Sequence, residues 1–77
     1  MPANSLLNTP NGKKLKITGV VGGKTLKDKL RQYGLFVGDQ VRVLRLAPLG
    51  GPVLIEANGR EIALGRGIAA KIIVDAA

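Results

Sequence analysis

The chain has 77 residues, a formal net charge of +7, and neither cysteine nor histidine. This length suits one domain, residues 1–77, around a single hydrophobic core. The missing residue types exclude disulfides, thiolate nucleophiles and the usual zinc, haem and iron–sulfur ligand sets, so no cofactor is expected. No apolar run reaches the length of a membrane span and no signal-peptide pattern is present, so we expect a cytoplasmic protein.

The first part of the chain, residues 1–12, is rich in proline, asparagine and glycine. These residues favour turns and loops over regular elements. We expect a loosely ordered N-terminal segment that Leu6 and Leu7 attach to the body of the domain.

A mainly β fold follows from five segments with strand patterns, which are 14–21, 40–47, 53–57, 60–64 and 71–75. The third and fourth flank Asn58-Gly59, the signal for a type I′ hairpin, which would pair Glu56 with Glu61. Gly65–Ala70 has room for one additional helical turn. Short strands with turn signals between them favour a small five-stranded barrel over a parallel sheet.

One short helix is expected from Leu26 to about Tyr33. Thr25 can cap its start, with Asp28 completing a capping box. Gly34 can end it in the left-handed conformation, which brings Leu35 against the helix in a Schellman motif.

The helical spacing predicts two faces. Leu26, Leu30 and Tyr33 form a buried stripe. A solvent-facing stripe contains three cations, which are Lys24, Lys27 and Arg31.

Two glycine-rich stretches resemble nucleotide-binding motifs but fail their requirements. Gly19–Thr25 ends in Gly-Lys-Thr, yet only three residues separate its outer glycines where a phosphate-binding loop needs four. Gly65–Ala70 matches G-x-G-x-x-A, but the chain ends at Ala77, before the second strand that a dinucleotide site needs. We interpret both stretches as backbone turns.

The residues for catalysis are scarce, and we expect no enzyme. The chain has one serine, Ser5, and no histidine to activate it. Glu56 and Glu61 would face each other on a solvated surface, balanced by Arg45 and Arg60. General acid–base chemistry needs instead a desolvated cleft that shifts one pKa.

The positive charge is concentrated in residues 13–31, which contain seven basic residues and one acid. Such a patch attracts nucleic acid, an anionic membrane surface or an acidic protein face, although it can also serve solubility alone. Stacking of single-stranded nucleic acid needs several exposed aromatic residues, and the chain has only Tyr33 and Phe36. Nucleic acid is therefore the less favoured partner.

Phe36 lies in a loop between Gly34 and Gly38. If exposed beside Leu35 and Leu49, it would form an apolar docking spot. The alternative is that Phe36 packs over the end of the helix.

Three segments carry a resemblance to a known family. They are the Leu-x-x-x-Gly-Leu-x-x-Gly stretch at 30–38, the Ala-Pro-Leu-Gly-Gly-Pro turn at 47–52 and the Ile-Ala-Leu segment at 62–64. In this order and spacing the chain resembles the FeoA family of ferrous-iron transport accessory proteins, in its stand-alone form. The resemblance extends from about Leu15 to Val74.

The resemblance implies an SH3-like barrel that works with the GTP-hydrolysing membrane transporter for Fe²⁺ by contacting its cytoplasmic part. Two positions depart from the family, which usually carries arginine at position 29 and often at position 65. Lys29 keeps the charge but cannot form a bidentate fork, so an arginine-finger role is not supported there.

Together these observations predict a non-enzymatic adaptor that binds the cytoplasmic G-protein region of the ferrous-iron transporter and modulates transport. Its cations would steer it to an acidic protein surface or to the anionic inner membrane leaflet. Its expected contact residues are Lys24, Lys27, Lys29, Arg31, Leu35, Phe36 and Leu49. The competing hypothesis is a small nucleic-acid-binding β-barrel that uses the basic patch at 13–31.

Overall fold

The structure is a computed structural model that describes residues 4–77; residues 1–3 of the predicted N-terminal segment lie outside this part. Six strands form one antiparallel sheet in the order β1-β6-β2-β3-β4-β5. They are β1 (Asn4–Ser5), β2 (Leu15–Val20), β3 (Gln40–Leu46), β4 (Val53–Ala57), β5 (Arg60–Leu64) and β6 (Ile72–Ala76). The expected fold class, a small mainly β SH3-like fold with one short helix and an additional helical turn, is confirmed.

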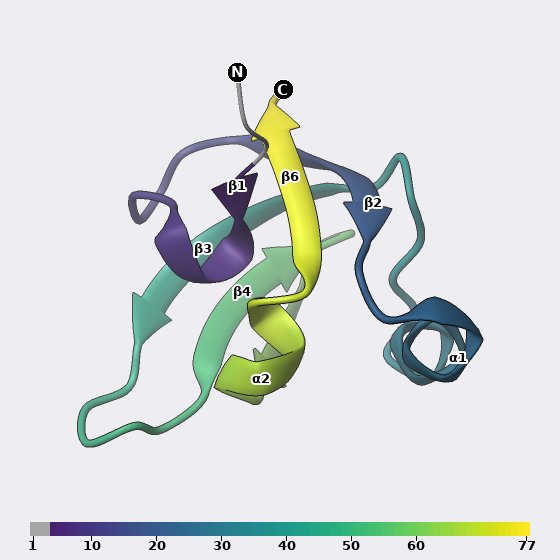
Figure 1. The fold of residues 1–77 in the computed structure, drawn as a ribbon. Coiled ribbons are helices and arrows are strands. Elements are labelled where there is room, and N and C mark those ends of the chain that lie inside the picture. Colours follow the sequence, from purple (N-terminus) through teal and green to yellow (C-terminus); the bar gives the residue numbers. More distant parts are fainter. Residues whose placement is uncertain (1–3) are drawn as a thin grey trace.

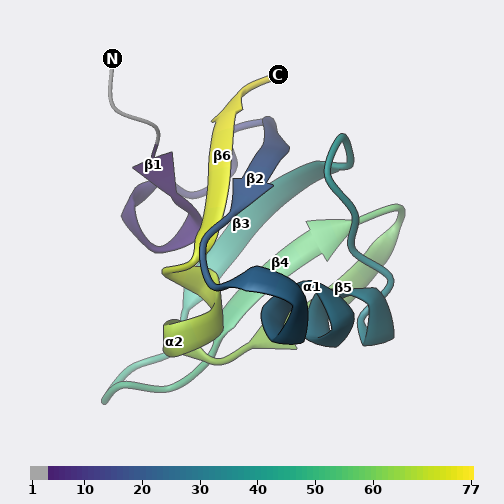
Figure 2. The same ribbon diagram turned by 45° about the vertical axis from the view of Figure 1, so that its right-hand side comes forward.

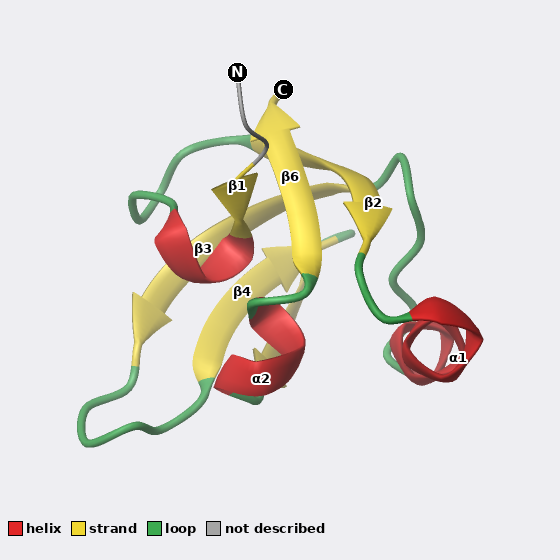
Figure 3. Cartoon of the chain, in the orientation of Figure 1, coloured by secondary structure: helices red, strands yellow, loops and turns green. Residues whose placement is uncertain are grey.

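The sheet is strongly twisted, and β6 passes in front of β3 and β4 in Figure 1. The long helix α1 (Gly23–Gln32) lies at one margin of the sheet, and the single turn α2 (Arg66–Ala69) precedes β6. Figure 2 shows α1 from a second side, and Figure 3 separates helices, strands and loops by colour. This arrangement leaves most of the surface of α1 open to solvent.

The core is aliphatic and comes from the inward faces of all the longer strands. Alternate residues of β3 and β4 are buried, such as Val43 and Ile55, which pair across the two strands. Burying a side chain of this size contributes about 1.5–3 kcal/mol, so a small set of aliphatic residues can hold this domain together.

The hairpin between β4 and β5 forms as predicted. Asn58 and Gly59 both have positive φ angles, 54° and 76°, which a type I′ turn requires. Glu56 faces Glu61 and Ala57 faces Arg60, because the two-residue turn sets the register.

The sixth strand comes from the N-terminal segment, where the sequence predicts none. Asn4 pairs with Val74 and Ser5 with Ile73, which places β1 on the outer side of β6. Leu6 follows in a 3-10 turn, η1 (Leu6–Asn8), and is completely buried. A strand of two residues is too short to show the alternation of polar and apolar residues from which a strand is predicted.

The start of α1 differs from the prediction. The helix begins at Gly23 rather than Leu26, its N-cap is Gly22, and no side chain caps it. Thr25 therefore lies inside the first turn, and the predicted capping box with Asp28 is wrong. Gly22 and Gly23 have φ angles of 127° and 73°, so glycine backbone makes the sharp turn from β2 into the helix.

The end of α1 is the predicted Schellman motif. Gly34, with φ of 76°, donates its N–H to the carbonyl of Arg31, and Leu35 donates to the carbonyl of Leu30. Leu30 is buried, whereas Leu26 and Tyr33 are half-buried. The buried stripe of the helix is thus narrower than predicted, since α1 sits at the margin of the sheet.

Candidate partner-binding surface

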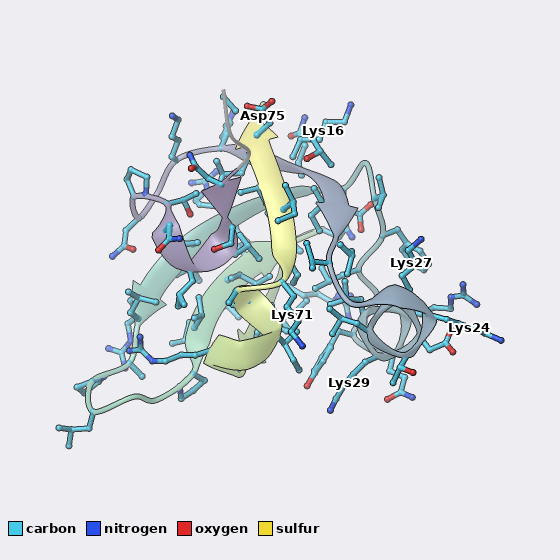
Figure 4. The ribbon with its side chains drawn as sticks, viewed as in Figure 1. Lys16, Lys24, Lys27, Lys29, Lys71 and Asp75 are labelled. Carbon is cyan, nitrogen blue, oxygen red and sulfur yellow. The ribbon has the colours of Figure 1, made fainter. Side chains whose placement is uncertain are left out.

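The cations of α1 leave the helix in two directions. Figure 4 shows Lys24 and Lys27 pointing outward, while Lys29 points to the side on which Lys71 lies. Helical spacing explains this division, because Lys24, Lys27 and Arg31 lie three and seven residues apart on one stripe and Lys29 does not. The stripe predicted from the sequence is therefore confirmed, and Lys29 belongs to a different face.

None of these helix cations is neutralised within residues 4–77. The one ion pair in this part of the chain joins Arg42 Nε and Glu56 Oε1 at 3.8 Å, on β3 and β4. The cations of α1 are exposed and have no carboxylate partner of their own. They remain available to an external acidic group.

A groove of about 160 Å³ opens between α1, the end of β2 and the loop that follows the helix. Val20, Leu30 and Leu35 form apolar parts of its lining, together with Phe36 and Val37. Two cations of the helix stripe, Lys27 and Arg31, also line it. The groove thus brings an apolar surface and positive charge into one place.

The loop beside the groove is held by hydrogen bonds rather than by burial. The carboxylate of Asp39 accepts a bond of 3.0 Å from the Phe36 N–H, and the Asp39 N–H donates to the Phe36 carbonyl. Gly38 and Asp39 bond to both backbone groups of Ile17. Phe36 and Val37, 52% and 58% exposed, therefore project from a fixed backbone.

The hairpin supports the same loop from the other side. Arg60 Nη2 donates a bond of 3.1 Å to the carbonyl of Tyr33, at the end of α1. Asn58 Nδ2 donates to the Asp39 carboxylate at 3.4 Å. Arg60 therefore places a cation on a helix-end carbonyl that the helix itself leaves free, and Asn58 ties the hairpin to the loop carboxylate.

The predicted apolar docking spot is only partly assembled. Of the two alternatives for Phe36, the structure shows the exposed one, but Leu35 is 2% exposed and belongs to the core. The predicted juxtaposition of Leu49 with Phe36 is wrong. Leu49 lies in the loop between β3 and β4, and Figures 1 and 2 both place that loop on the far side of the molecule from α1.

The loop that carries Leu49 has its own support. Arg66 of α2 donates from Nε to the Gly51 carbonyl and from Nη2 to the Ala47 carbonyl, each at 3.0 Å. Leu49 is fully exposed, with a φ angle of 58°. Leu49 and Phe36 lie in different loops, and the sequence alone does not show how these two loops are placed relative to each other.

The paired glutamates of the hairpin, Glu56 and Glu61, face each other across β4 and β5 as predicted. Glu56 faces Arg42 across β3 and β4 and forms an ion pair with it, so the predicted partners Arg45 and Arg60 are replaced by Arg42. Arg60 is engaged with the helix end instead. A polar hollow of about 240 Å³ lies beside this pair and is lined by side chains of both charges.

The two nucleotide-like motifs form turns. Gly19–Thr25 joins the end of β2 to the start of α1, and Gly65–Ala70 contains only the short turn α2. Within residues 4–77, no three Asp or Glu side chains come close enough to hold a metal ion. In the same residues, no helix has both the length and the apolar character needed to cross a membrane.

Three groove residues were missing from the predicted contact set: Val20, Val37 and Leu30, of which Leu30 was predicted only as part of the buried helix stripe. Val37 neighbours Phe36 between two glycines, and its exposure follows from the same loop argument that selected Phe36. Val20 ends β2 and reaches the groove because the glycine turn folds α1 back beside the strand. Sequence periodicity could not place Val20 and Val37 together.

The chain is similar to known proteins in both sequence and structure. The FeoA domain profile matches residues 4–76. The "Putative Fe(2+) transport protein A" of Methanocaldococcus jannaschii is 33% identical over 64 residues, which are 83% of this chain and 76% of that protein.

Solved structures agree with this result. The crystal structure of an iron uptake regulatory protein, FeoA, superposes with a TM-score of 0.84 at 28% identity and covers 97% of each chain. The solution structure of the FeoA protein from Chlorobium tepidum gives 0.81 at 30% identity, over 94% of this chain and 69% of that one. The chain therefore belongs to the FeoA domain family.

Proposed function

We propose that this protein is a non-enzymatic accessory protein of ferrous-iron transport, which binds the cytoplasmic G-protein region of the Fe²⁺ membrane transporter and modulates transport. The observation that carries the proposal is the open apolar groove with two unpaired cations in its lining, on a chain of the FeoA domain family. The name of the relative from Methanocaldococcus jannaschii, "Putative Fe(2+) transport protein A", supports a role in ferrous-iron transport.

The proposed contact centres on the groove. Phe36 and Val37 supply apolar area, and Lys27 and Arg31 supply charge that orients an approaching acidic surface. Lys24 lies on the same stripe and would extend the contact along α1. Lys29 points away from this stripe, and the loop that carries Leu49 lies on the far side of the molecule, so each would need a separate contact with the partner.

The test is a titration of the ¹⁵N-labelled full chain with the soluble cytoplasmic G-protein region of the transporter, followed by NMR. We expect shifts of the amide signals between residues 24 and 38, with little change around Leu49. Shifts confined to the opposite loop would contradict the proposed surface. An absence of all shifts would contradict the proposed partner.

A parallel titration with random-sequence DNA tests the nucleic-acid alternative. Phosphate binding loses affinity steeply and linearly in log[salt], because counterions are released. An apolar contact loses much less. Tight, salt-sensitive DNA binding without binding to the transporter region would assign the basic patch at 13–31 to nucleic acid.

A further inference from the structure

We infer that the groove between α1 and the loop Leu35–Val37 takes an acidic amphipathic polypeptide segment, which inserts one leucine- or phenylalanine-sized side chain and places carboxylates beside Lys27 and Arg31. The inference deepens the proposed function and rests on that function for the identity of the partner. The chemistry of the bound segment follows from the groove alone.

The volume of the groove limits the size of the side chain that can insert into it, which we call the anchor. Its volume is about 160 Å³, and five of its lining residues are apolar. A cavity of roughly 150 Å³ lined by leucine, isoleucine and phenylalanine binds benzene. The groove therefore has room for one large aliphatic or aromatic side chain, and a whole helix cannot enter it.

The charged residues of the groove determine the charge of the residues that should flank the inserted side chain. Its two charged lining residues are Lys27 and Arg31, one helical turn apart and thus about 6 Å along the axis. The acid of the loop, Asp39, is already engaged. Its carboxylate accepts hydrogen bonds from the Phe36 N–H and from the side-chain amide of Asn58. Carboxylates on a bound segment would find cations and no competing acid of the lining.

The groove needs little rearrangement to bind. Hydrogen bonds from Asp39 and Gly38 fix the loop, and the Schellman motif together with Arg60 fixes the end of α1. Binding to a surface that is already ordered avoids the entropic cost of ordering side chains and loops. A short segment with one anchor can therefore bind detectably.

Other occupants fit the groove less well. A second copy of this chain would bring another net charge of +7 to a basic surface. A flat bilayer would meet the projecting Phe36 and Val37 but not the recessed Leu30 and Leu35. An acidic polypeptide satisfies both the concave apolar surface and the charge.

The probe is a synthetic helical peptide of alanine and glutamine with Glu, Leu and Glu at positions i, i+3 and i+4, so that all three share one face. Added to the ¹⁵N-labelled full chain at low salt, it should shift amide signals of Lys27–Val37 with roughly millimolar affinity. Two control peptides carry Gln for both Glu residues or Ala for Leu. Each should bind roughly tenfold more weakly.

Two protein variants of equal net charge separate the groove from the charge of the whole molecule. Lys27→Glu with Arg31→Glu should abolish measurable peptide binding. Lys13→Glu with Lys16→Glu makes the same change of charge at exposed positions that do not line the groove, and should weaken binding less than about threefold. Equal losses in both variants would overturn the inference.

The remaining outcomes are distinct. Shifts outside the groove, or equal binding of the Gln peptide, would overturn the inference. Co-sedimentation with phosphatidylserine vesicles, without peptide shifts, would assign the groove to the membrane instead. Peptide binding without binding to the transporter region would retain the inference and reject the proposed function. Binding to the transporter region without peptide binding would retain the proposed function and reject the inference.

Discussion

Two loops on opposite sides of the molecule expose large apolar side chains, and both are held by hydrogen bonds. The loop after α1 presents Phe36 and Val37, and the loop between β3 and β4 presents Leu49. They differ in their surroundings. Phe36 and Val37 line a groove with Lys27 and Arg31, whereas Leu49 lines neither of the two hollows described above.

The difference shows that exposure of an apolar residue is a poor criterion for a binding site. Single exposed apolar side chains are common on soluble proteins. A concave apolar surface beside unpaired charge is a more specific combination, because it determines both the size and the charge of what can bind. On this criterion the α1 side is the candidate site, and the β3–β4 loop is not.

The largest expected effect separates two adjacent residues of the α1 loop. Leu35→Ala should lower the free energy of unfolding by about 3 kcal/mol, because Leu35 is buried in the core. Phe36→Ala should lower it by less than about 1 kcal/mol, since half of its side chain is exposed. Urea unfolding measures both values.

Binding to the transporter region should depend on the same two positions in the opposite order, with the larger effect at Phe36. Leu35→Met keeps the volume and should leave both stability and affinity for the transporter region nearly unchanged. Phe36→Ala should keep the fold and weaken that affinity roughly tenfold. If Phe36→Ala binds as well as the original chain, the groove is not the contact.

The next effect concerns the support of the β3–β4 loop. Arg66→Ala removes two charged hydrogen bonds to the carbonyls of Ala47 and Gly51, and should cost about 2 kcal/mol of unfolding free energy. Arg66→Lys cannot reproduce the two-pronged geometry and should recover only part of this loss. Full recovery by lysine would show that charge alone holds the loop.

A smaller effect is expected at the support of the α1 loop. Asp39→Ala removes the acceptor for the Phe36 N–H and should cost about 1 kcal/mol, measured by urea unfolding. Asp39→Asn keeps an acceptor oxygen and serves as the control. Because the loop would then be ordered only on binding, Asp39→Ala should also weaken peptide binding about threefold. Unchanged peptide affinity would show that the loop need not be ordered in advance.

Local signals in the sequence predicted much of the fold. The hairpin at Asn58-Gly59 and the Schellman motif at Gly34 depend on φ angles that only a few residue types adopt readily, so both were predictable. The start of α1 was not, because Thr25 and Asp28 match a capping box equally well in a helix that glycine backbone begins. Propensity identifies the helix more reliably than its first residue.

The candidate site was predictable only in part. Helical spacing correctly grouped Lys24, Lys27 and Arg31, whereas the glycine-bounded loop left open whether Phe36 is exposed or packed over the helix end. The groove also needs Val20, which comes from a different element, and the position of the loop between β3 and β4 depends on how the whole sheet twists. Such relations between distant segments leave no periodic signal in one sequence.

The smallest expected effect tests whether Leu49 has any role in binding. A leucine with φ of 58° is strained by about 1 kcal/mol, whereas asparagine tolerates this conformation. Leu49→Asn should therefore raise the free energy of unfolding by about 0.5 kcal/mol and leave affinity for the transporter region unchanged. Leu49→Gly relieves the same strain but adds freedom to the unfolded chain, so its gain should be smaller. If Leu49→Asn instead weakens binding as much as Phe36→Ala does, the strained leucine is a second contact, and both loops take part in recognition.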